Sequence, residues 1–443
     1  MSSTQGVSAV KQALLQKVRE EIVPALEQLV DELPDQLADF GTAEAELRQG
    51  LIQLARHLLD LWAHVADKKI TRPGCPTCGV PMRHRGLAEA AVVTTVGGVT
   101  YRRPRWRCRD CQTECYPHDA LLRFQAHGVS WAAAKVVSRL AAQIPSLEEA
   151  GKNFEEDYGV HLAKETVRQI AEAAGKTILE QEDEQRRRVM QREAPLPETD
   201  KAPEKAYVFA DGTTVHSEGD WHEIRVATVA TEDAAGNAGE RHSRARFLSV
   251  EEVAWTLVLL ARGVGYQNAK RRAFIADGAA WLWKLQASFF ANAVAILDWY
   301  HLAEHVHKAA NELHGLGSPR AEEWARRIKT ELWEGRVAEA RSLTEQERVR
   351  TRSPGKRAAL QELLTYLENN EAHMDYPRYR ELGLPIGSGQ VEAQCKTLVG
   401  GRCKQAGMRN WTYAGAEALL RLRAAKHDGT FDDLWTAKLR LAA

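Results

Sequence analysis

Residues 272–283, RAFIADGAAWLW, guide the interpretation of the whole sequence, because here an apolar run ends in an aspartate, Asp277. Two other apolar runs end in the same way, with Asp211 in AYVFADGTTV and Asp298 in AVAILDWYHLAEH. A carboxylate at the end of a buried strand costs desolvation free energy unless it is paired, lies at the rim of the sheet or binds a metal. Each aspartate alone also fits a turn or a helix N-cap. Only the three together indicate a functional site.

Residues 207–301 alternate between the patterns of strands and helices. The expected order is a strand at 207–210, strands in WHEIRVATVA and RARFLSV, a helix in EEVAWTLVLLARG, a strand in RAFIA, a helix in AWLWKLQASFF and a strand in AVAIL. Three strands, a helix and then alternation is the order of a ribonuclease-H-like α/β fold. In that order Asp211 lies on the first strand and Asp277 on the fourth, and the two strands are neighbours.

A fourth acid, Glu392, lies in GSGQVEAQCK, four positions after Ser388. A capping box requires a spacing of three, so that structural role does not explain the glutamate, although Ser388 alone is still expected to cap the helix. If Glu392 lies one turn into this helix, it points back toward Asp211 and Asp277. Carboxylates that close repel one another unless cations compensate. Two Mg²⁺ or Mn²⁺ ions about 3.5 to 4 Å apart would do so and would stabilise a phosphoryl displacement.

Four cysteines form two CxxC pairs, Cys75 with Cys78 and Cys108 with Cys111, separated by 29 residues. Such pairs converge four thiolates into the tetrahedral geometry that zinc prefers, which predicts a structural Zn²⁺ with no position left for water. A disulfide pair and unliganded cysteines are the alternatives. The three other cysteines, among them Cys395, are expected to be small packing residues.

Charge is balanced overall, with 60 basic and 60 acidic side chains, but it is segregated along the chain. Residues 1–67 carry 5 basic and 11 acidic side chains, and residues 68–115 carry 10 basic and 3 acidic ones. A local basic cluster is the usual footprint of a phosphate backbone, with a solvated charged face as the alternative. The strand that enters the second cysteine pair carries four arginines that we expect to contact phosphates: Arg102, Arg103, Arg105 and Arg107.

Between the cysteines and the first strand, SLEEAGKNFEEDYG and LAKETVRQIAEAAGKTI are spaced like a helix-turn-helix. An ordinary helical hairpin is the alternative. If the second helix is a recognition helix, its first turns carry the side chains that would read the DNA groove, namely Lys164, Thr166, Arg168 and Gln169. Trp411 near the C-terminus is either a stacking platform for an unpaired base or a core residue, and its apolar surroundings favour the core.

The complete prediction is a multidomain α/β protein. Its segments are a helical N-terminal region suited to packing or self-association (1–67), a zinc-ribbon-like module (68–118), a helical or helix-turn-helix DNA-binding region (119–191), a linker with three prolines (192–206), a ribonuclease-H-like core (207–301), an all-helical insertion (302–380) and the C-terminal part of the catalytic core with the final helices (381–443). No apolar run reaches the roughly 18 residues of a membrane span, and the N-terminus lacks signal-peptide features. These features predict a cytoplasmic protein.

The blocks FADGT, FIADGAAWLW, LDWYHLAEHVHK and GLPIGSGQVE resemble the signature blocks of bacterial insertion-sequence DDE transposases of the ISKra type, related to the Mutator-like superfamily. The resemblance runs from the cysteine module at residue 75 to the final helix. It implies that Asp211, Asp277 and Glu392 are the catalytic triad that binds Mg²⁺. It also implies that Asp298 and His301 match the aspartate-x-x-histidine signature that these enzymes carry between the second and third acids.

The resemblance implies a transposase that cuts and joins DNA at the ends of an insertion sequence. Its partners would be double-stranded DNA, both terminal inverted repeats and target, and further copies of the chain, at least a dimer on DNA. It would associate with the bacterial nucleoid when bound to DNA, and it would use no membrane and no small-molecule substrate. A structure-selective nuclease of the same fold and a DNA-binding regulator without catalysis are the alternatives.

Overall fold

The protein was analysed as a computed structural model, which describes residues 9–33, 39–65, 72–117, 119, 128–405, 408 and 410–435. The chain forms two compact units, residues 1–174 with 432–443, and residues 175–431. The division falls within helix α7 (Lys164–Met190) and not at residues 192–206, where the sequence predicted a linker. That segment is held against the second unit, because Asn268 Nδ2 donates to the carbonyls of Thr199 and Lys201, both at 2.9 Å. Its prolines indicate irregular backbone, which can still pack.

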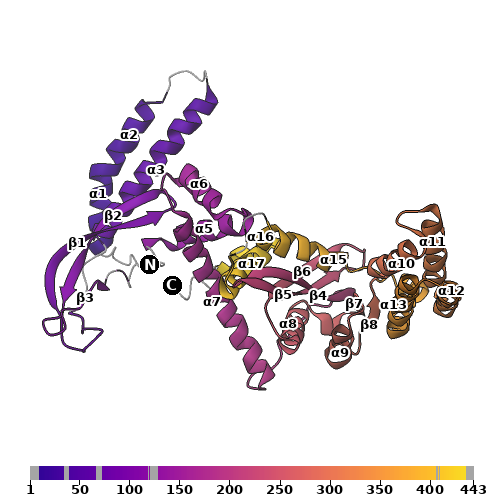
Figure 1. Ribbon diagram of the computed structural model, residues 1–443. Coiled ribbons are helices and arrows are strands. Elements are labelled where there is room, and N and C mark those ends of the chain that lie inside the picture. The colour runs from indigo at the N-terminus through magenta and orange to yellow at the C-terminus, as the bar shows by residue number, and fades with distance from the viewer. Residues whose placement is uncertain are drawn as a thin grey trace, which may run out of the picture. The chain divides into compact units, whose positions relative to one another are not determined.

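The first unit begins with two long helical stretches, as the amphipathic spacing predicts (Figure 1). One consists of α1 (Ala9–Lys17), the π-helical turn η1 (Val18–Ile22) and α2 (Val23–Asp31), and the other is α3 (Phe40–Val65). His57 and Glu21 join the two stretches at 2.9 Å. Gly50 allows close packing, since a Cβ there would lie 2.3 Å from the Leu29 side chain.

A three-stranded antiparallel sheet follows, in the order β1 (Arg83–Thr94), β2 (Gly97–Arg107) and β3 (Glu114–Cys115). The hairpin between β1 and β2 turns just before Gly97, which adopts a φ of +104°. Glycine suits this turn because it adopts positive φ without a steric penalty.

The helices α5 (Trp131–Gln143), α6 (Leu147–Tyr158) and α7 follow the sheet. Ser130 and Ser146 cap the first two helices through their hydroxyls, which accept hydrogen bonds from Ala133 N and Glu149 N at 3.2 Å. Gly159 ends α6 in the left-handed conformation. The short connections predicted from the sequence are therefore present on both sides of α6.

The second unit is built on a five-stranded sheet in the order β6-β5-β4-β7-β8 (Figure 1). Strands β4 (Lys205–Ser217), β5 (Asp220–Glu232) and β6 (Ala238–Arg246) are antiparallel, whereas β7 (Arg271–Ala276) and β8 (Val294–Leu297) run parallel to β4. Helix α8 (Val250–Gly263) and the 3₁₀ turn η3 (Tyr266–Asn268) connect β6 to β7, and α9 (Ala280–Phe289) connects β7 to β8. This is a mixed α/β sheet with the predicted order of elements.

Alternate residues of the strands pack into two cores, one on each face of the sheet, as the period of two in a strand requires. Val208 and Phe274 pack with α8 and α9 on one face. Phe209 and Ile275 pack on the other face, which α10 and α17 also cover. Asp211 on β4 lies two residues after Phe209, and Asp277 directly follows the last residue of β7, Ala276. Both aspartates therefore come just after Phe209 and Ile275, the last residues at which the two strands pair.

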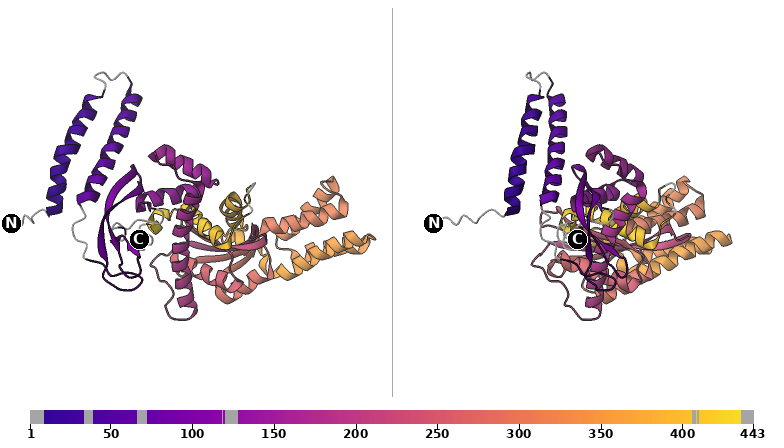
Figure 2. Two further views of the ribbon diagram at one scale, coloured as in Figure 1. Left: turned by 60° about the vertical axis from the view of Figure 1, so that its left-hand side comes forward. Right: turned by 90° about the vertical axis from the view of Figure 1, so that its left-hand side faces the viewer.

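The rest of the second unit is helical. Figures 1 and 2 show α10 to α13 packed side by side beyond β8. The elements are α10 (Trp299–His314), α11 (Pro319–Trp333), α12 (Val337–Arg350), α13 (Pro354–Asn370), η4 (Glu371–His373), α14 (Tyr376–Glu381), α15 (Gly389–Gln394), the π-helical η5 (Cys395–Gly400), α16 (Gly401–Cys403) and α17 (Tyr413–His427). Helix α18 (Phe431–Leu434) begins at the last residue of the second unit and continues into residues 432–443, which belong to the first unit. None of the helices described here has the length and apolar character needed to cross a bilayer.

Candidate functional site

The four cysteines of the two CxxC pairs converge in the first unit, with their sulfur atoms all within 4.8 Å of one another. Cys75 and Cys111 lie 3.4 Å apart, and Cys78 lies 3.5 Å from Cys108. These separations exceed a disulfide bond of about 2.05 Å, so the pairs are not cross-linked. Four sulfur ligands in a compact cluster are the donor set that a tetrahedral zinc ion takes. The cluster can therefore hold a metal such as zinc.

The backbone of each CxxC turn positions its thiols. Gly79 N donates to Cys75 O, and Cys75 N donates to Val80 O, both at 2.9 Å, and this closes the first turn. In the second turn Cys108 N donates to Thr113 O at 2.9 Å. Hydrogen bonds from Thr113 lower the pKa of Cys111 to about 6, which favours the thiolate form that binds metal.

The four arginines predicted to contact phosphates do not form one surface. Successive side chains of a strand point to opposite faces, so Arg102 lies opposite Arg103, Arg105 and Arg107. Only Arg102 and Arg107 are exposed. Arg103 pairs with Asp119, and its guanidinium lies 4.0 Å from the centre of the Tyr116 ring. Arg105 makes a bond of 3.4 Å to the Arg85 carbonyl.

The predicted groove-reading residues lie in the first turns of α7. Lys164 is exposed and Thr166 is half-buried. Arg168 makes hydrogen bonds of 2.9 Å to Glu165 and 2.5 Å to Glu172, and Gln169 Nε2 donates to Glu165 at 2.9 Å. These interactions join residues of the same helix. They are typical of the solvated surface of an ordinary helical hairpin, which was the alternative interpretation.

Asp211 and Asp277 lie at the same end of neighbouring strands in the second unit. Strands β4 and β7 are parallel, and Phe209 is paired with Ile275 two residues before the aspartates. Burial raises the pKa of Asp211, and the nearby Asp277 carboxylate raises it further. Gly212 N donates to Asp211 Oδ1 at 2.7 Å. The Asp277 carboxylate therefore lies close enough to Asp211 to affect the pKa of Asp211.

Glu392 lies on α15, which belongs to the same unit. Its side chain is 42% exposed and lies 3.8 Å from Lys396. Cys395, one turn further on, donates to Asp211 Oδ2 at 3.4 Å, and its pKa is raised by burial and by the charges of Asp211 and Glu392. The sequence treated Cys395 as a packing residue, but its thiol contacts a candidate metal ligand. Its position three residues after Glu392 was the signal that could have identified it.

The three carboxylates of Asp211, Asp277 and Glu392 are not packed as tightly as the cysteines. Within the described part of the chain, the only group of three or more potential ligands whose atoms all lie within 4.8 Å is the cysteine cluster. Ligand atoms lie this close together when they surround a single ion. The ligands of two ions about 4 Å apart are spread over a larger site and lie farther from each other. Like charges without a cation between them also favour separation.

Asp298 is completely buried and does not belong to the exposed part of the site. Its carboxylate caps α10 by accepting from Tyr300 N at 2.6 Å and His301 N at 2.9 Å. It also accepts hydrogen bonds from the backbone and the hydroxyl of Ser388. Ser388 therefore does not cap α15 as the sequence predicted, because Asp298 binds its hydroxyl. Because Asp298 is fully buried, its carboxylate contacts other groups of the protein and not solvent.

His301 is the more accessible partner in the predicted pair, with 39% of its side chain exposed. It contributes to the electrostatic environment of Asp211. Its ring lies 5.0 Å from that of His305, which stacks on Tyr366 at 3.9 Å and 17°. The His305 ring is half-buried, and burial lowers its pKa.

Trp411 is half-buried and packs against the main core of the second unit, beside Arg402 at 5.4 Å. Its backbone forms a bridge to Ser217 at the end of β4. Packing against the core agrees with the position that the apolar surroundings favoured.

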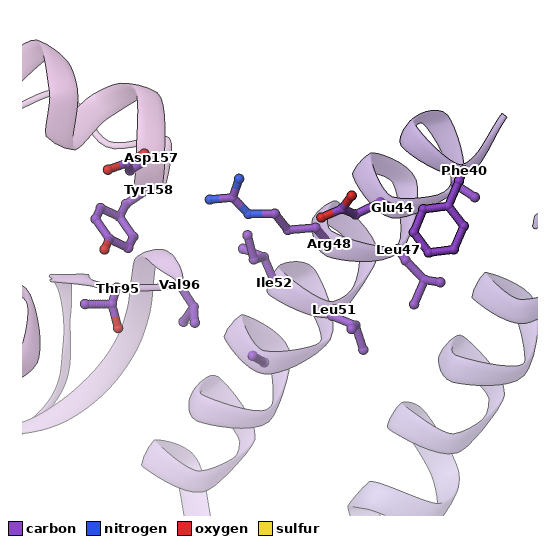
Figure 3. A pocket seen from close by; sticks show the side chains of 12 residues that line it. Phe40, Glu44, Leu47, Arg48, Leu51, Ile52, Thr95, Val96, Asp157 and Tyr158 are labelled. Carbon is purple, nitrogen blue, oxygen red and sulfur yellow. The ribbon is translucent and has the colours of Figure 1, made fainter.

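A separate hollow of about 800 Å³ lies in the first unit (Figure 3). One wall is the apolar face of α3, where Phe40 is 75% and Leu51 is 47% exposed. Thr95 and Val96 from the β1–β2 turn and Tyr158 from α6 form the other wall. None of the candidate carboxylates or cysteines lines it.

A family model described as Uncharacterised protein family (UPF0236) matches residues 84–435. This match covers most of the chain, so the protein belongs to that family. A search of curated proteins finds no match.

Proposed function

We propose that this member of the UPF0236 family is a DDE-type DNA transposase of the insertion-sequence class, with a ribonuclease-H-like catalytic domain. The observation that carries the proposal is that Asp211 on β4 lies close to Asp277, which directly follows the adjacent parallel strand β7. Glu392 on α15 supplies a third carboxylate, since the Cys395 thiol that follows it contacts Asp211. The strand order β6-β5-β4-β7-β8 supports the ribonuclease-H-like assignment.

The donor set of this site suits Mg²⁺ or Mn²⁺, because both prefer carboxylate oxygens. Asp211, Asp277 and Glu392 would hold two such ions, which supply charge stabilisation to the attacking and leaving oxygens of a phosphoryl displacement. Asp298 orients the loop before Glu392 through Ser388. Gly387 permits a close approach in that loop, because a Cβ there would lie 2.7 Å from the Tyr300 ring.

The proposed reaction has two displacement steps. Water attacks a phosphodiester at the end of the element, and the 3′ oxygen leaves as a free hydroxyl. That hydroxyl then attacks a phosphodiester of the target, and the target's own 3′ oxygen leaves. No bond to the protein forms in either step. The cysteine module, with zinc bound, and α5 to α7 would hold the DNA, and at least two copies of the chain would act together on the two ends.

The test uses purified protein and a supercoiled plasmid that carries the DNA flanking the gene, with Mg²⁺ or Mn²⁺ present. Products in which an element end is joined to new DNA support a transposase. Cutting without joining indicates a structure-selective nuclease, and binding without either reaction indicates a regulator. Asp277→Asn serves as the matched control, because it removes a metal ligand and changes the shape of the side chain very little. Joining that persists in this variant would contradict the assignment of the site.

A further inference from the structure

Helix α13 of the helical segment reaches the turn that carries Asp277. The Tyr366 hydroxyl donates to the Asp277 carbonyl oxygen at 2.7 Å, across 89 residues of sequence. This bond uses the backbone of Asp277 and leaves its carboxylate to other partners.

Gly278 makes this approach possible in two ways. Its φ of +100° lies in the region that favours glycine. A Cβ at this position would also lie 3.0 Å from Tyr366 and 3.1 Å from Asn370, closer than ordinary contact. The backbone at Gly278 and the side chains of α13 are therefore fitted to each other.

A second contact holds the helix that follows the turn. Asn370, one helical turn after Tyr366, is 1% exposed, and its Oδ1 accepts from Trp283 Nε1 at 2.7 Å. Trp283 lies on α9, which begins at Ala280 just after the turn. Asn370 also donates to the Tyr366 carbonyl at 2.9 Å. Helix α13 thus contacts both the Asp277–Gly278 turn and the helix that follows it.

The Tyr366 ring is itself held in place. It stacks on His305 of α10 at 3.9 Å and 17°. Helix α10 begins directly after Asp298, whose carboxylate caps it. The ring orientation therefore depends on the same helix that carries His301.

We propose that Tyr366 is a positioning residue for Asp277, through which the helical segment α10 to α14 sets the second candidate metal ligand. The proposal rests on the proposed function only for the identity of the reaction. Asp277 also makes a local bond, from Ala279 N to its Oδ1 at 2.9 Å, so removing the Tyr366 bond loosens the turn without destroying it. The carboxylate then samples more orientations, and the metal site forms less often.

Tyr366→Phe tests this, because it keeps the stacked ring and removes only the hydroxyl. Tyr379→Phe is the matched control, since the Tyr379 hydroxyl donates to a strand carbonyl of the same unit, Ala295 O, at 3.1 Å, and the residue is 3% exposed. Two readouts are required: calorimetric titration of each protein with Mn²⁺ in the absence of DNA, and kcat for cleavage. Substitution of a residue that supports a metal ligand typically lowers metal affinity or activity by about 10- to 100-fold. We expect Tyr366→Phe to lose about tenfold in both, and Tyr379→Phe to match the wild type.

Trp283→Phe provides a second route if Tyr366→Phe folds poorly, because it removes the Asn370 bond and leaves the Tyr366 hydroxyl intact. It should weaken Mn²⁺ binding in the same direction by a smaller factor. If Tyr366→Phe and Tyr379→Phe bind Mn²⁺ equally well, Tyr366 has no positioning role. If the wild type binds Mn²⁺ at this site and Tyr366→Phe binds it less, but neither cuts DNA, the positioning role stands and the transposase proposal fails. If the wild type shows no Mn²⁺ binding that is lost in Asp277→Asn, both the positioning role and the transposase proposal are overturned.

Discussion

The cysteine cluster and the carboxylate site are both built from metal-ligand residues, but their ligands are held in different ways. The four thiols lie within 4.8 Å of one another and come from two tight turns. The carboxylates of Asp211, Asp277 and Glu392 come from two strands and a helix and remain further apart. Thiols can hydrogen-bond to one another without a cation, whereas carboxylates repel. Other side chains support the two aspartates in different ways, because Cys395 contacts the Asp211 carboxylate and Tyr366 binds the backbone carbonyl of Asp277.

The largest expected effect concerns the cysteine cluster. Metal binding contributes on the order of 10 kcal/mol to folding in isolated small zinc modules. Cys78→Ser should therefore lose zinc and unfold residues 75–111, as measured by metal analysis and by hydrogen exchange over that segment. Mn²⁺ binding at the carboxylates should be unchanged, because the cysteines and carboxylates belong to different units. Wild-type protein with less than one zinc per chain would count against this prediction.

Asp277→Asn should have the next largest effect, on chemistry and not on folding. Substitution of a residue that supports a metal ligand typically lowers activity by roughly 10- to 100-fold. Removal of the ligand itself should reduce the cleavage rate by more than this. DNA binding should persist, because the substituted side chain keeps its shape. Cleavage rates and gel-shift titrations measure the two separately. A variant that still cuts at the wild-type rate would remove Asp277 from the site.

Asp298→Asn tests whether Asp298 binds a metal ion or only holds the neighbouring backbone in place. The buried Asp298 carboxylate accepts hydrogen bonds from two backbone groups at the start of α10 and from Ser388. Loss of a charged acceptor among buried donors should cost about 1 to 3 kcal/mol of stability. Mn²⁺ binding should be largely retained. Asp375→Asn is the control, since Asp375 caps α14 from an exposed position through a bond of 3.3 Å from Arg378 N. Complete loss of Mn²⁺ binding in Asp298→Asn would make Asp298 a ligand.

These two regions also differ in how far the sequence predicts them. The CxxC spacing is local, and the thiols converge as expected. The neighbouring positions of Asp211 and Asp277 follow from the order of strands and helices, which is also a pattern readable along the chain. The supports could not be predicted, because Tyr366 lies 89 residues from Asp277 and neither residue carries a local signal of the contact. The Ser388 hydroxyl was assigned to a helix cap for the same reason, since its competitor Asp298 is 90 residues away.

The boundary between the two units does not coincide with the proline-rich segment that the composition indicated. The sequence predicted a linker at residues 192–206 from its three prolines. Residues 192–204 contain no helix or strand, but such irregular backbone can still pack against a neighbour. Asn268 binds the carbonyls of Thr199 and Lys201, which keeps the segment within the second unit. The boundary lies instead inside the regular helix α7, where periodicity gives no indication of it.

The smallest expected effect tests whether the arginines beside the cysteine cluster bind DNA. Arg102 and Arg107 are exposed, whereas Arg103 pairs with Asp119 and stacks on Tyr116. Each phosphate contact contributes about one unit to the dependence of log K on log salt concentration. Arg102→Ala and Arg107→Ala should each reduce that slope by about one unit if the side chain contacts a phosphate. Arg103→Ala should leave the slope nearly unchanged, because its charge is already paired within the protein. Since Arg102 and Arg107 lie on opposite faces of β2, a change in only one of them would identify the face of the strand that meets DNA. An unchanged slope in both would assign these arginines to a solvated surface.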